Sequence, residues 1–391
     1  MGSESTDETG AASALGDLAI LDFSRVLAGP FATMMLADLG ATVTKVERPG
    51  IGDETRSWGP PNDANGNATY FQAVNRNKRS VAIDLSTETG RDRAQQLSDT
   101  ADVIVENFRP DVMEKLGLGY ETLSAANPRL IYCSITGFGS ATARAAALPG
   151  YDLLVQALGG LMSITGTPDG APQKVGVALV DVICGLFASI GILAALRHRE
   201  RTGEGQRVEV DLLSCLLAAL VNQGSAYTLA GEVAQRMGNA HPSVAPYDLF
   251  KTADGDLVLA IGTDRQFRAL AQVLGCPELA EDERFASNSA RVAARETLHE
   301  RLERALRTKP AAHWVRALSA VRVPAGEVND IAGAFALAES LGLEPIVEVP
   351  GPGGRVRRLT RNPIGLSATP PSYRTGPPEL PASGDTPPPG R

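Results

Sequence analysis

Short apolar runs alternate with amphipathic stretches along the first 140 residues. The runs at 18–24, 41–49 and 80–85 are too short for most helices and have the composition of buried strands. The opening strand, helix and strand form a unit of about 30 residues, which is the seed of a parallel sheet. The same pattern predicts helices at 29–40, 90–101 and 112–119 and further strands at 102–108 and 129–139. The alternation therefore predicts a doubly wound α/β domain.

Two long helical patterns follow within residues 151–201. The second pattern is almost wholly apolar in its middle, which predicts a buried central helix. A strand at 205–213 and helical residues to about 230 continue the same domain.

The character of the chain changes near residue 231. The pair Asp254-Gly255 predicts a hairpin within 247–262, and 264–320 reads as charged amphipathic helices. Short strands and turns are expected over 321–366, and a proline-rich tail from 369 is expected to lie extended on the surface. The predicted organisation is a disordered N-terminus (1–14), a large α/β domain (15–225), a smaller α+β domain (226–330) and a return to the large domain with the tail (331–391).

Composition excludes several classes of protein. The formal net charge of −8 disfavours nucleic acid as a partner. The four cysteines form no CxxC pair, so we expect reduced, mostly buried thiols, no disulfides and no metal site. The first residues lack the basic and apolar parts of a secretion signal. The apolar stretch 176–196 comes closest to a membrane span, but Asp181 interrupts it. We therefore predict a cytoplasmic protein with no membrane partner.

The β-α-β start raises the question of a dinucleotide site. The GxGxxG loop that cradles NAD phosphates is missing, and SRVLAGPFA stands in its place. The sequence also lacks a P-loop, HExxH and GxSxG. NAD-dependent chemistry and these hydrolytic mechanisms are therefore disfavoured.

Asp181 lies where the long apolar helix is expected to begin. A carboxylate there is costly to bury unless it is hydrogen-bonded or used in chemistry. A helix start offers free N–H groups, so Asp181 could be a plain N-cap. It could equally be an activated nucleophile or base. The local sequence leaves both interpretations open.

Basic residues mark the ends of successive strands. Lys45 and Arg48 belong to KVERPG, Lys78 and Arg79 belong to NRNKRS, and Arg109 and Lys115 follow further along the chain. Singly these are ordinary surface charges, but together they predict a basic rim at the carboxyl ends of parallel strands, suited to a ligand with several phosphates. His241, in the loop GNAHPSVAPY, is a further candidate to line a site, whereas the other histidines are expected on the surface.

Long ordered motifs give the chain a family resemblance. They are LDFSRVLAGPFATMMLADLGATVTKVERPGIGDETRSWGPP, NRNKRSVAIDL, VENFRPDVMEKLGLGY, NPRLIYCSITGFG, PGYD, GGLMSITG and GVALVDVICGLFASIGILAAL. With these motifs the sequence resembles the class III CoA-transferases, a family that also contains α-methylacyl-CoA racemases. The similarity covers roughly residues 15–370.

The resemblance implies a Rossmann-like large domain, a smaller domain and an interlocked homodimer of two ring-shaped subunits. The family's catalytic aspartate falls on Asp181. Its carboxylate would attack an acyl-CoA to give a mixed anhydride, and the released thiolate would then form an aspartyl-CoA thioester. Backbone N–H groups near the helix start would stabilise the oxyanions. Coenzyme A is thus expected as a substrate, with no permanently bound cofactor.

The family's CoA contacts map onto a set of residues near the strand ends. Arg48 and Lys115 suit the phosphates, and Phe108 suits the adenine face. The full set implied by the resemblance is Val26, Leu27, Ala28, Arg48, Asn107, Phe108 and Lys115.

Three further positions concern the choice of reaction and substrate. The racemases carry a histidine where this chain has Tyr151, and tyrosine is a poor base, so transfer is favoured over racemisation. The stretch from His241 to Ala245 lacks the glycine-rich flap of the oxalate-handling branch, which disfavours formyl and oxalate exchange. Several segments look most like transferases that move CoA from succinyl-CoA to dicarboxylic acids. Arg56 is the candidate cation for the second carboxylate, with a plain surface role as the alternative.

The main hypothesis is therefore a CoA-transferase acting on a small carboxylic or dicarboxylic acid, with succinyl-CoA as the expected donor. The alternatives are an acyl-CoA racemase or epimerase, against which Tyr151 argues, and a catalytically silent CoA-binding paralogue, against which the retention of Asp181 in its full motif argues.

Overall fold

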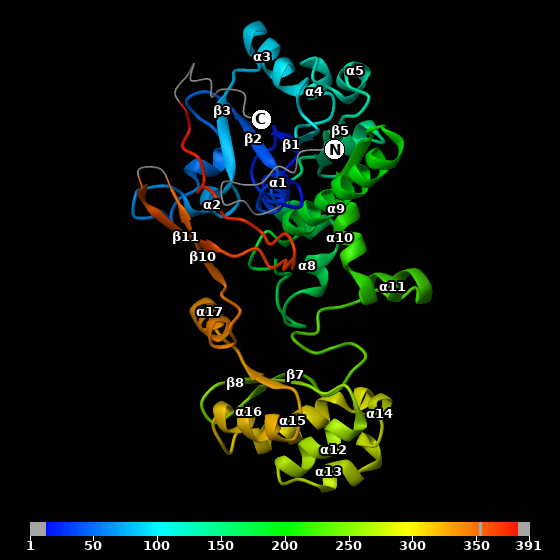
Figure 1. Cartoon of the computed structure of the whole chain (residues 1–391). Helices are drawn as coiled ribbons and strands as arrows, with labels where there is room; N and C mark the ends of the chain where they lie inside the picture. Colours follow the sequence, from blue (N-terminus) through cyan, green and yellow to red (C-terminus); the bar gives the residue numbers. More distant parts are fainter. Residues whose placement is uncertain (1–12, 352–353, 382–391) are drawn as a thin grey trace. The chain divides into compact units, whose positions relative to one another are not determined.

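The computed structural model describes residues 13–351 and 354–381, and its contacts divide the chain into two compact units (Figure 1). The first unit is formed within Met1–Leu161, Val175–Gly231 and Glu344–Arg391, and the second within Met162–Lys174 and Glu232–Leu343. The sequence analysis expected residues 162–174 in the large domain. In the structure they belong to the second unit, where Gly238 N donates to Gly166 O at 3.0 Å. The predicted disordered stretch 1–14 lies almost wholly outside the described residues.

The sheet of the first unit has six parallel strands in the order β3-β2-β1-β4-β5-β6. The strands are β1 (Ala19–Asp22), β2 (Thr42–Glu47), β3 (Lys78–Ala82), β4 (Val103–Glu106), β5 (Ile131–Thr136) and β6 (Arg207–Asp211). The predicted parallel α/β sheet is confirmed. Strand order reverses between β1 and β4, and doubly wound sheets bind ligands at the carboxyl ends of the strands at such a switch point.

Helices cover both faces of this sheet (Figure 1). The side chains of Ile20 and Val103 enter the core on one face, and those of Leu21 and Ile104 enter the core on the other, as the two-residue period of a strand requires. The first face is covered by α1 (Ala28–Asp38), α9 (Leu179–Thr202) and α10 (Leu212–Ala219), and the second by α3 (Glu88–Ser98), α4 (Val112–Lys115) and α5 (Tyr120–Ala126).

The predicted central helix is confirmed as α9, which packs on α1, β5, β6 and α10. Its buried positions, among them Cys184 and Ala188, belong to the core of the first unit. By length and composition α9 is apolar enough to cross a membrane, and the bent pair of α10 and α11 (Val221–Ala230) passes the same test. This is a weak indication, because a core helix such as α9 passes that test too.

Several elements differ from the sequence expectation. The first long helical pattern breaks at Gly159 and Gly160, where Gly160 has a φ of 87° that ends a helix. The helix expected to run to 230 bends by 84° between α10 and α11. The remaining short helices of this region are η1 (Glu54–Ser57), α2 (Thr69–Ala73), α6 (Ala143–Ala147), α7 (Asp152–Leu158) and α8 (Leu161–Ile164).

The second unit combines a small antiparallel sheet with helices. The predicted hairpin is confirmed, because Leu249 pairs with Val258 across the turn. Its strands are β7 (Tyr247–Lys251), β8 (Asp256–Ala260) and β9 (Ala325–Glu327). Its helices are α12 (Asp264–Val273), α13 (Glu278–Glu281), η2 (Glu283–Phe285), α14 (Asn288–Ala293), α15 (Arg295–Leu306), α16 (Ala311–Ala320) and α17 (Ile331–Ser340).

The chain ends on the first unit. A hairpin of β10 (Ile346–Pro350) and β11 (Val356–Thr360) precedes an extended segment, as predicted for the tail. Arg374 donates to the carbonyl oxygens of Ala37, Gly40 and Ala41 at 2.9–3.1 Å. The segment is therefore fastened to the end of α1.

Candidate active site

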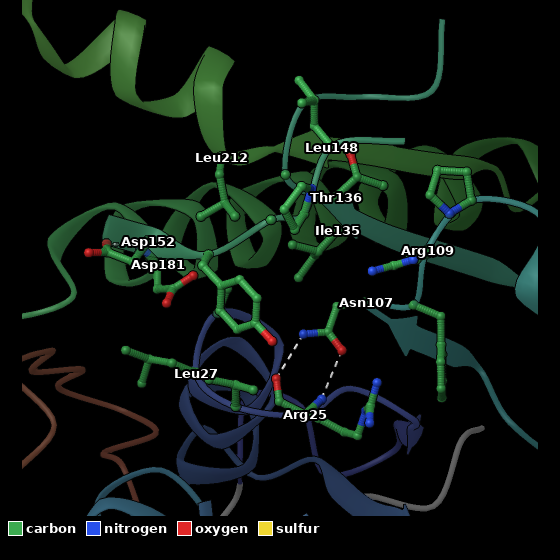
Figure 2. Close-up of a pocket in the computed structure, with 18 of the residues that line it drawn as sticks. Arg25, Leu27, Asn107, Arg109, Ile135, Thr136, Leu148, Asp152, Asp181 and Leu212 are labelled. Atoms are coloured by element: carbon green, nitrogen blue, oxygen red, sulfur yellow. Dashed lines mark hydrogen bonds between the residues drawn. The ribbon is translucent and has the colours of Figure 1, made fainter. Parts of the chain in front are cut away.

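A pocket opens at the carboxyl ends of β1, β4 and β5, beside the switch point (Figure 2). This is where a doubly wound sheet binds ligands. Every residue that lines it belongs to the first unit. The lining comprises residues 25–28 after β1, 107–110 after β4, 135–137 at the end of β5, 148–152 before and at the start of α7, and Glu54, Asp181 and Leu212.

Asp181 is the third residue of α9 and faces this pocket (Figure 2). The helix has Ala178 as its N-cap, without a side-chain cap bond. The N–H groups of Val180 and Asp181 are bonded to Asp152 Oδ1, at 2.8 and 3.3 Å. Asp181 is therefore not the N-cap, and within the described part of the chain no donor bonds to its carboxylate.

The protonation of Asp181 is unusual for a carboxyl group. Burial, followed by the neighbouring charge of Asp152, raises the pKa of Asp181 to about 7. A carboxylate that is partly shielded from water and has no protein donor is more nucleophilic than one in bulk water. Of the interpretations that the sequence left open, the geometry argues against a plain N-cap, and a nucleophile or base remains the prediction for Asp181.

Asp152 holds the start of α9 from the start of α7. Its Oδ1 accepts from α9, and its Oδ2 accepts from Gln156 Nε2 at 2.6 Å. Gln156 in turn accepts from Val175 N at 2.9 Å. Asp152 was not predicted from the sequence as a site residue. The only signal was its position directly after Tyr151 in PGYD, where an acid in a first helical turn has a routine explanation.

Tyr70 of α2 lies near the same carboxylates. It packs in a small apolar cluster with Leu27, Ala178 and Val182, next to the start of α9. Burial, and then the charges of Asp181, Asp152 and Asp53, raise the pKa of the Tyr70 phenol to about 12. Tyr70 is therefore a neutral phenol at physiological pH.

The first predicted CoA segment lines the pocket. Val26, Leu27 and Ala28 form one wall, and Ala28 begins α1. Asn107, also predicted as a CoA contact, uses its amide on the backbone of Arg25: Oδ1 accepts from Arg25 N and Nδ2 donates to Arg25 O, both at 2.8 Å (Figure 2). The geometry therefore shows Asn107 positioning the loop.

Two arginines line the pocket: Arg109, which the sequence placed in the basic rim, and Arg25, which the sequence did not single out. Arg25 lies over the ring of Phe108, with its guanidinium carbon 5.1 Å from the ring centroid. Arg109 lines the same mouth (Figure 2). Over the described ranges neither guanidinium has a carboxylate partner. Arg48 and Lys115 are exposed, and their predicted roles at the phosphates stay predictions.

The predicted basic rim needs correction. Lys78 and Arg79 begin β3, so they lie at the amino end of that strand. Lys45 and Lys78 are buried, and each forms an ion pair, with Asp53 and Asp22 respectively. These two lysines are internal charges and not part of a solvated rim.

Arg56 is engaged within the protein. Its Nε and NH2 donate to Glu47 at 2.7 and 2.6 Å, its NH1 donates to Pro378 O at 3.1 Å, and its guanidinium carbon lies 3.7 Å from the Phe71 ring centroid. Only 18% of the side chain is exposed. We therefore do not retain Arg56 as the cation that binds an acceptor carboxylate.

Tyr151 and His241 differ in their settings. Tyr151 lines the pocket and is 60% exposed, directly before Asp152. His241 belongs to the second unit, where Arg295 donates to its carbonyl oxygen at 2.7 Å. The predicted role of each in substrate binding stays a prediction.

Glu106, at the end of β4, is a second unusual carboxyl group. It accepts from Phe108 N at 2.9 Å and borders a neighbouring cavity that shares Phe108 and Arg109 with the first. Burial raises the pKa of Glu106 to about 7. The four cysteines are free, and all but Cys276 are buried. No group of three or more potential metal ligands occurs among the residues described.

Comparisons with known proteins agree with the resemblance noted above. The model of CoA-transferase family III matches residues 15–383. The succinate–glutarate CoA-transferase of Agrobacterium fabrum is 44% identical over 94% of this chain and 92% of its own length. An acetyl-CoA:oxalate CoA-transferase of Acetobacter aceti is 41% identical over 94% of this chain and 93% of its own.

A solved structure gives the same result for the fold. The crystal structure of a CaiB/BaiF family protein from Brucella suis superposes with a TM-score of 0.84 and 42% identity, covering 94% of this chain and 96% of that one.

Proposed function

Because the chain belongs to CoA-transferase family III, we propose that it moves coenzyme A from succinyl-CoA to a small dicarboxylic acid, with Asp181 as the nucleophile. One observation carries the proposal. Asp181 faces a pocket at the switch point of the sheet, and its carboxylate has no donor among the described residues. A relative named for succinate and glutarate supports the choice of acids.

The reaction would run in four exchanges at one carboxylate. An Asp181 oxygen attacks the thioester carbonyl, the C–S bond breaks, and CoA leaves as a thiolate beside a mixed anhydride. The thiolate attacks the aspartyl carbonyl and releases the donor acid. The acceptor carboxylate then attacks the aspartyl-CoA thioester and frees the thiolate again. In the last exchange the thiolate takes the acceptor's acyl group, and Asp181 is restored.

The backbone N–H groups at the start of α9, which were expected to stabilise the oxyanions, are already engaged. The first N–H groups of α9 already have acceptors: Val180 and Asp181 bond to Asp152, and Val182 bonds to Ala178 O. The N–H groups of Leu27 and Ala28, which line the pocket at the start of α1, have no acceptor within the described residues. We therefore place the oxyanion donors at the start of α1.

The arginines at the pocket mouth suit the phosphates of CoA. Arg25 and Arg109 present guanidinium groups that are not neutralised by a carboxylate within the described ranges. Guanidinium groups bind phosphate oxygens in pairs. Together with Phe108, they support a site for the nucleotide end of the substrate on this side of the pocket.

The exposed side of α9 is apolar and supports a homodimer. α9 leaves Leu186, Phe187, Ile190 and Leu193 on its exposed side, with Ile190 61% exposed. An apolar face of this kind is typical of a subunit interface. We propose that a second copy covers it in the interlocked arrangement that the resemblance implies.

Trapping the acyl-enzyme tests the proposal. The wild type and Asp181→Ala are incubated with succinyl-CoA and then hydroxylamine, which converts an acyl-aspartate into a stable hydroxamate, and the peptides are examined by mass spectrometry. We expect a modified peptide containing Asp181 in the wild type and none in the variant. An adduct formed only with another acyl-CoA would change the donor. No adduct with any acyl-CoA would reject the covalent route and favour a silent CoA binder.

Acceptors are then compared by product formation. Glutarate is the expected acceptor, and oxalate belongs in the panel, because a relative named for oxalate is nearly as similar as the glutarate one. Racemisation is measured separately by exchange of the α-proton of a 2-methylacyl-CoA in deuterated water. Exchange without CoA transfer would favour the racemase alternative.

A further inference from the structure

The loop between β1 and α1 is fastened by side chains from several elements. Its residues Ser24 to Val26 lead directly into the pocket wall. Ser24 N donates to Asp22 Oδ1 at 2.9 Å, and Ser24 O accepts from Lys45 Nζ at 2.7 Å. The amide of Asn107 bonds both backbone groups of Arg25. Val26 N lies 3.3 Å from Asp53 Oδ2. Five consecutive backbone groups of this loop, from Ser24 N to Val26 N, are thus bonded to side chains.

The conformation of this loop explains why so many bonds are needed. Val26 has a φ of 69°, in the left-handed region that a β-branched residue rarely adopts. Such a conformation persists only where the surroundings enforce it. Val26 lines the pocket, so its strain occurs in the wall that faces the substrate.

The pair of Lys45 and Asp53 is the centre of this arrangement. Lys45 Nζ lies 2.9 Å from Asp53 Oδ2, and both side chains are fully buried. The Thr55 N–H and hydroxyl donate to Asp53 Oδ1 at 3.0 and 2.7 Å, so the carboxylate is also fixed from its own loop. A buried ion pair is rarely a net source of stability compared with apolar side chains of the same size. Its retention here calls for a role besides stability.

We propose that Lys45 and Asp53 are positioning residues for substrate binding: together they hold the loop Ser24–Val26 in its strained conformation, so that Val26, Leu27 and Ala28 form the wall of the coenzyme A pocket. Lys45 fixes the loop through Ser24 O, and Asp53 fixes it through Val26 N. The inference rests on the proposed function, because it needs coenzyme A as the ligand of this pocket.

A second buried ion pair provides the matched control. Arg76 bonds Asp38 through Nε and NH2 at 2.9 and 2.6 Å, with side chains 3% and 0% exposed. This pair also lies in the first unit, but it contacts the C-terminal segment through Asn362 and does not contact the loop. Asp38→Asn should therefore lower stability as Asp53→Asn does, without moving the pocket wall.

The experiment measures binding and stability separately. The dissociation constant of coenzyme A itself is measured by calorimetry, and Tm by thermal unfolding, for the wild type, Asp53→Asn, Asp38→Asn and the double variant Lys45→Met/Asp53→Leu. We expect Asp53→Asn to weaken CoA binding by roughly tenfold or more, since small misplacements at a binding site have effects of this size. Asp38→Asn should change binding by less than about twofold while lowering Tm similarly.

The double variant separates positioning from stability. Replacing both charges by apolar side chains removes the unpaired buried charge, so Tm should recover towards the wild-type value. CoA binding should stay weak, because the loop is still released. A double variant that is stable and binds CoA like the wild type would overturn the inference.

Three further outcomes also bear on the inference. Loss of CoA binding in Asp38→Asn equal to that in Asp53→Asn would show general softening of the unit and reject a positioning role. If the double variant does not fold, the comparison of the two single variants decides. A wild-type protein that does not bind CoA would overturn the proposed function, and the inference with it.

Discussion

Asp152 begins α7 and Asp181 lies in the first turn of α9, and of the two only the Asp152 carboxylate has hydrogen-bond donors among the described residues. These donors fix the Asp152 carboxylate in place, whereas burial and the neighbouring Asp152 raise the pKa of Asp181. Two carboxyl groups with different surroundings can thus have different tasks: Asp152 holds the helix, and in the proposed reaction Asp181 attacks.

The pH dependence of the first half-reaction follows from this pair. Asp181 must be ionised to attack, and its pKa is about 7, so the rate of hydroxamate formation should rise with pH through about 7. Asp152→Asn removes the neighbouring negative charge and keeps an acceptor for Val180 N. The pKa of Asp181 should then fall, and the profile should move to lower pH.

The control for this profile is Glu106→Gln, because the pKa of Glu106 is also about 7. It should leave the midpoint in place. If the midpoint of the pH profile moved in Glu106→Gln and not in Asp152→Asn, the titrating group would be Glu106 and not Asp181.

Asp181 should also affect stability. The pKa of Asp181 is higher in the folded state than the usual value of 3.8. The contribution of its protonated carboxyl group to the free energy of unfolding is therefore fully present below pH 4 and is lost as pH rises through 7. Asp181→Asn should therefore raise Tm at pH 8, by roughly 2–4 °C, and have little effect at pH 5. Thermal unfolding at the two pH values measures this. An equal shift at both would mean that the charge of Asp181 has no cost in the folded state.

The position of Asp181 near the start of α9 was predictable, because a carboxylate in an apolar helix stands out in the sequence. Asp152 was not, because an acid in a first helical turn is ordinary. The role of Lys78 was also out of reach, since its partner Asp22 is 56 positions away and only the fold brings them together. Glu47 is only nine positions from Arg56, but no periodic pattern links a strand residue to the turn that follows it.

Among the elements, α1 and α9 meet at a glycine. A Cβ at Gly185 would lie 2.6 Å from Ala28 O and 3.1 Å from Phe31 Cδ1. Because the first of these is a backbone atom, a side chain at Gly185 would push the start of α1 away, and the pocket wall begins there.

Gly185→Ala should therefore lower the free energy of unfolding by about 1–3 kcal/mol and weaken CoA binding. Chemical denaturation and calorimetry give the two values. Gly224→Ala in α11 is the control: its nearest neighbour would be 3.4 Å away, and a helical alanine should be neutral or stabilising by about 0.5–1 kcal/mol. Equal effects at both glycines would show that the contact of α1 with α9 is not close.

Elements with strong periodicity were predicted well. The parallel strands are short apolar runs, and the hairpin in the second unit has a clear turn signal. The short helices α2 and α6 and the bend between α10 and α11 were missed, because they depend on tertiary contacts and not on a repeating pattern.

At the scale of the whole molecule, we predict from the exposed apolar face of α9 that the protein is a homodimer. The protein should have twice the chain mass of 41.0 kDa in solution, measured by light scattering or sedimentation. Ile190→Glu should weaken the association by roughly tenfold or more, because it places a charge in an apolar interface.

The control is Val356→Glu, which changes an equally exposed side chain, 61% in both cases, on a different element. It should leave the mass unchanged. A monomeric wild type at micromolar concentration would reject the dimer.

The division into two units was only partly visible in the sequence. Composition marks the change near residue 231, but 162–174 is bonded to the second unit through Gly238 N and the side chain of Arg236, which donate to the carbonyl oxygens of Gly166 and Thr167. Such a pairing leaves no compositional trace.

The first unit is completed by the last part of the chain, and this has a consequence for its biosynthesis. Asn362 and Arg374 bond to Asp38 and to the end of α1, more than 300 positions earlier. A ribosome adding about 5–20 residues per second reaches them roughly 15–70 seconds after α1 has been made. During that interval the buried carboxylate of Asp38 lacks one of its donors, and the second unit emerges in full. The nascent sheet therefore has to wait for its final fastening, so chaperone occupancy should persist until the C-terminal segment is released.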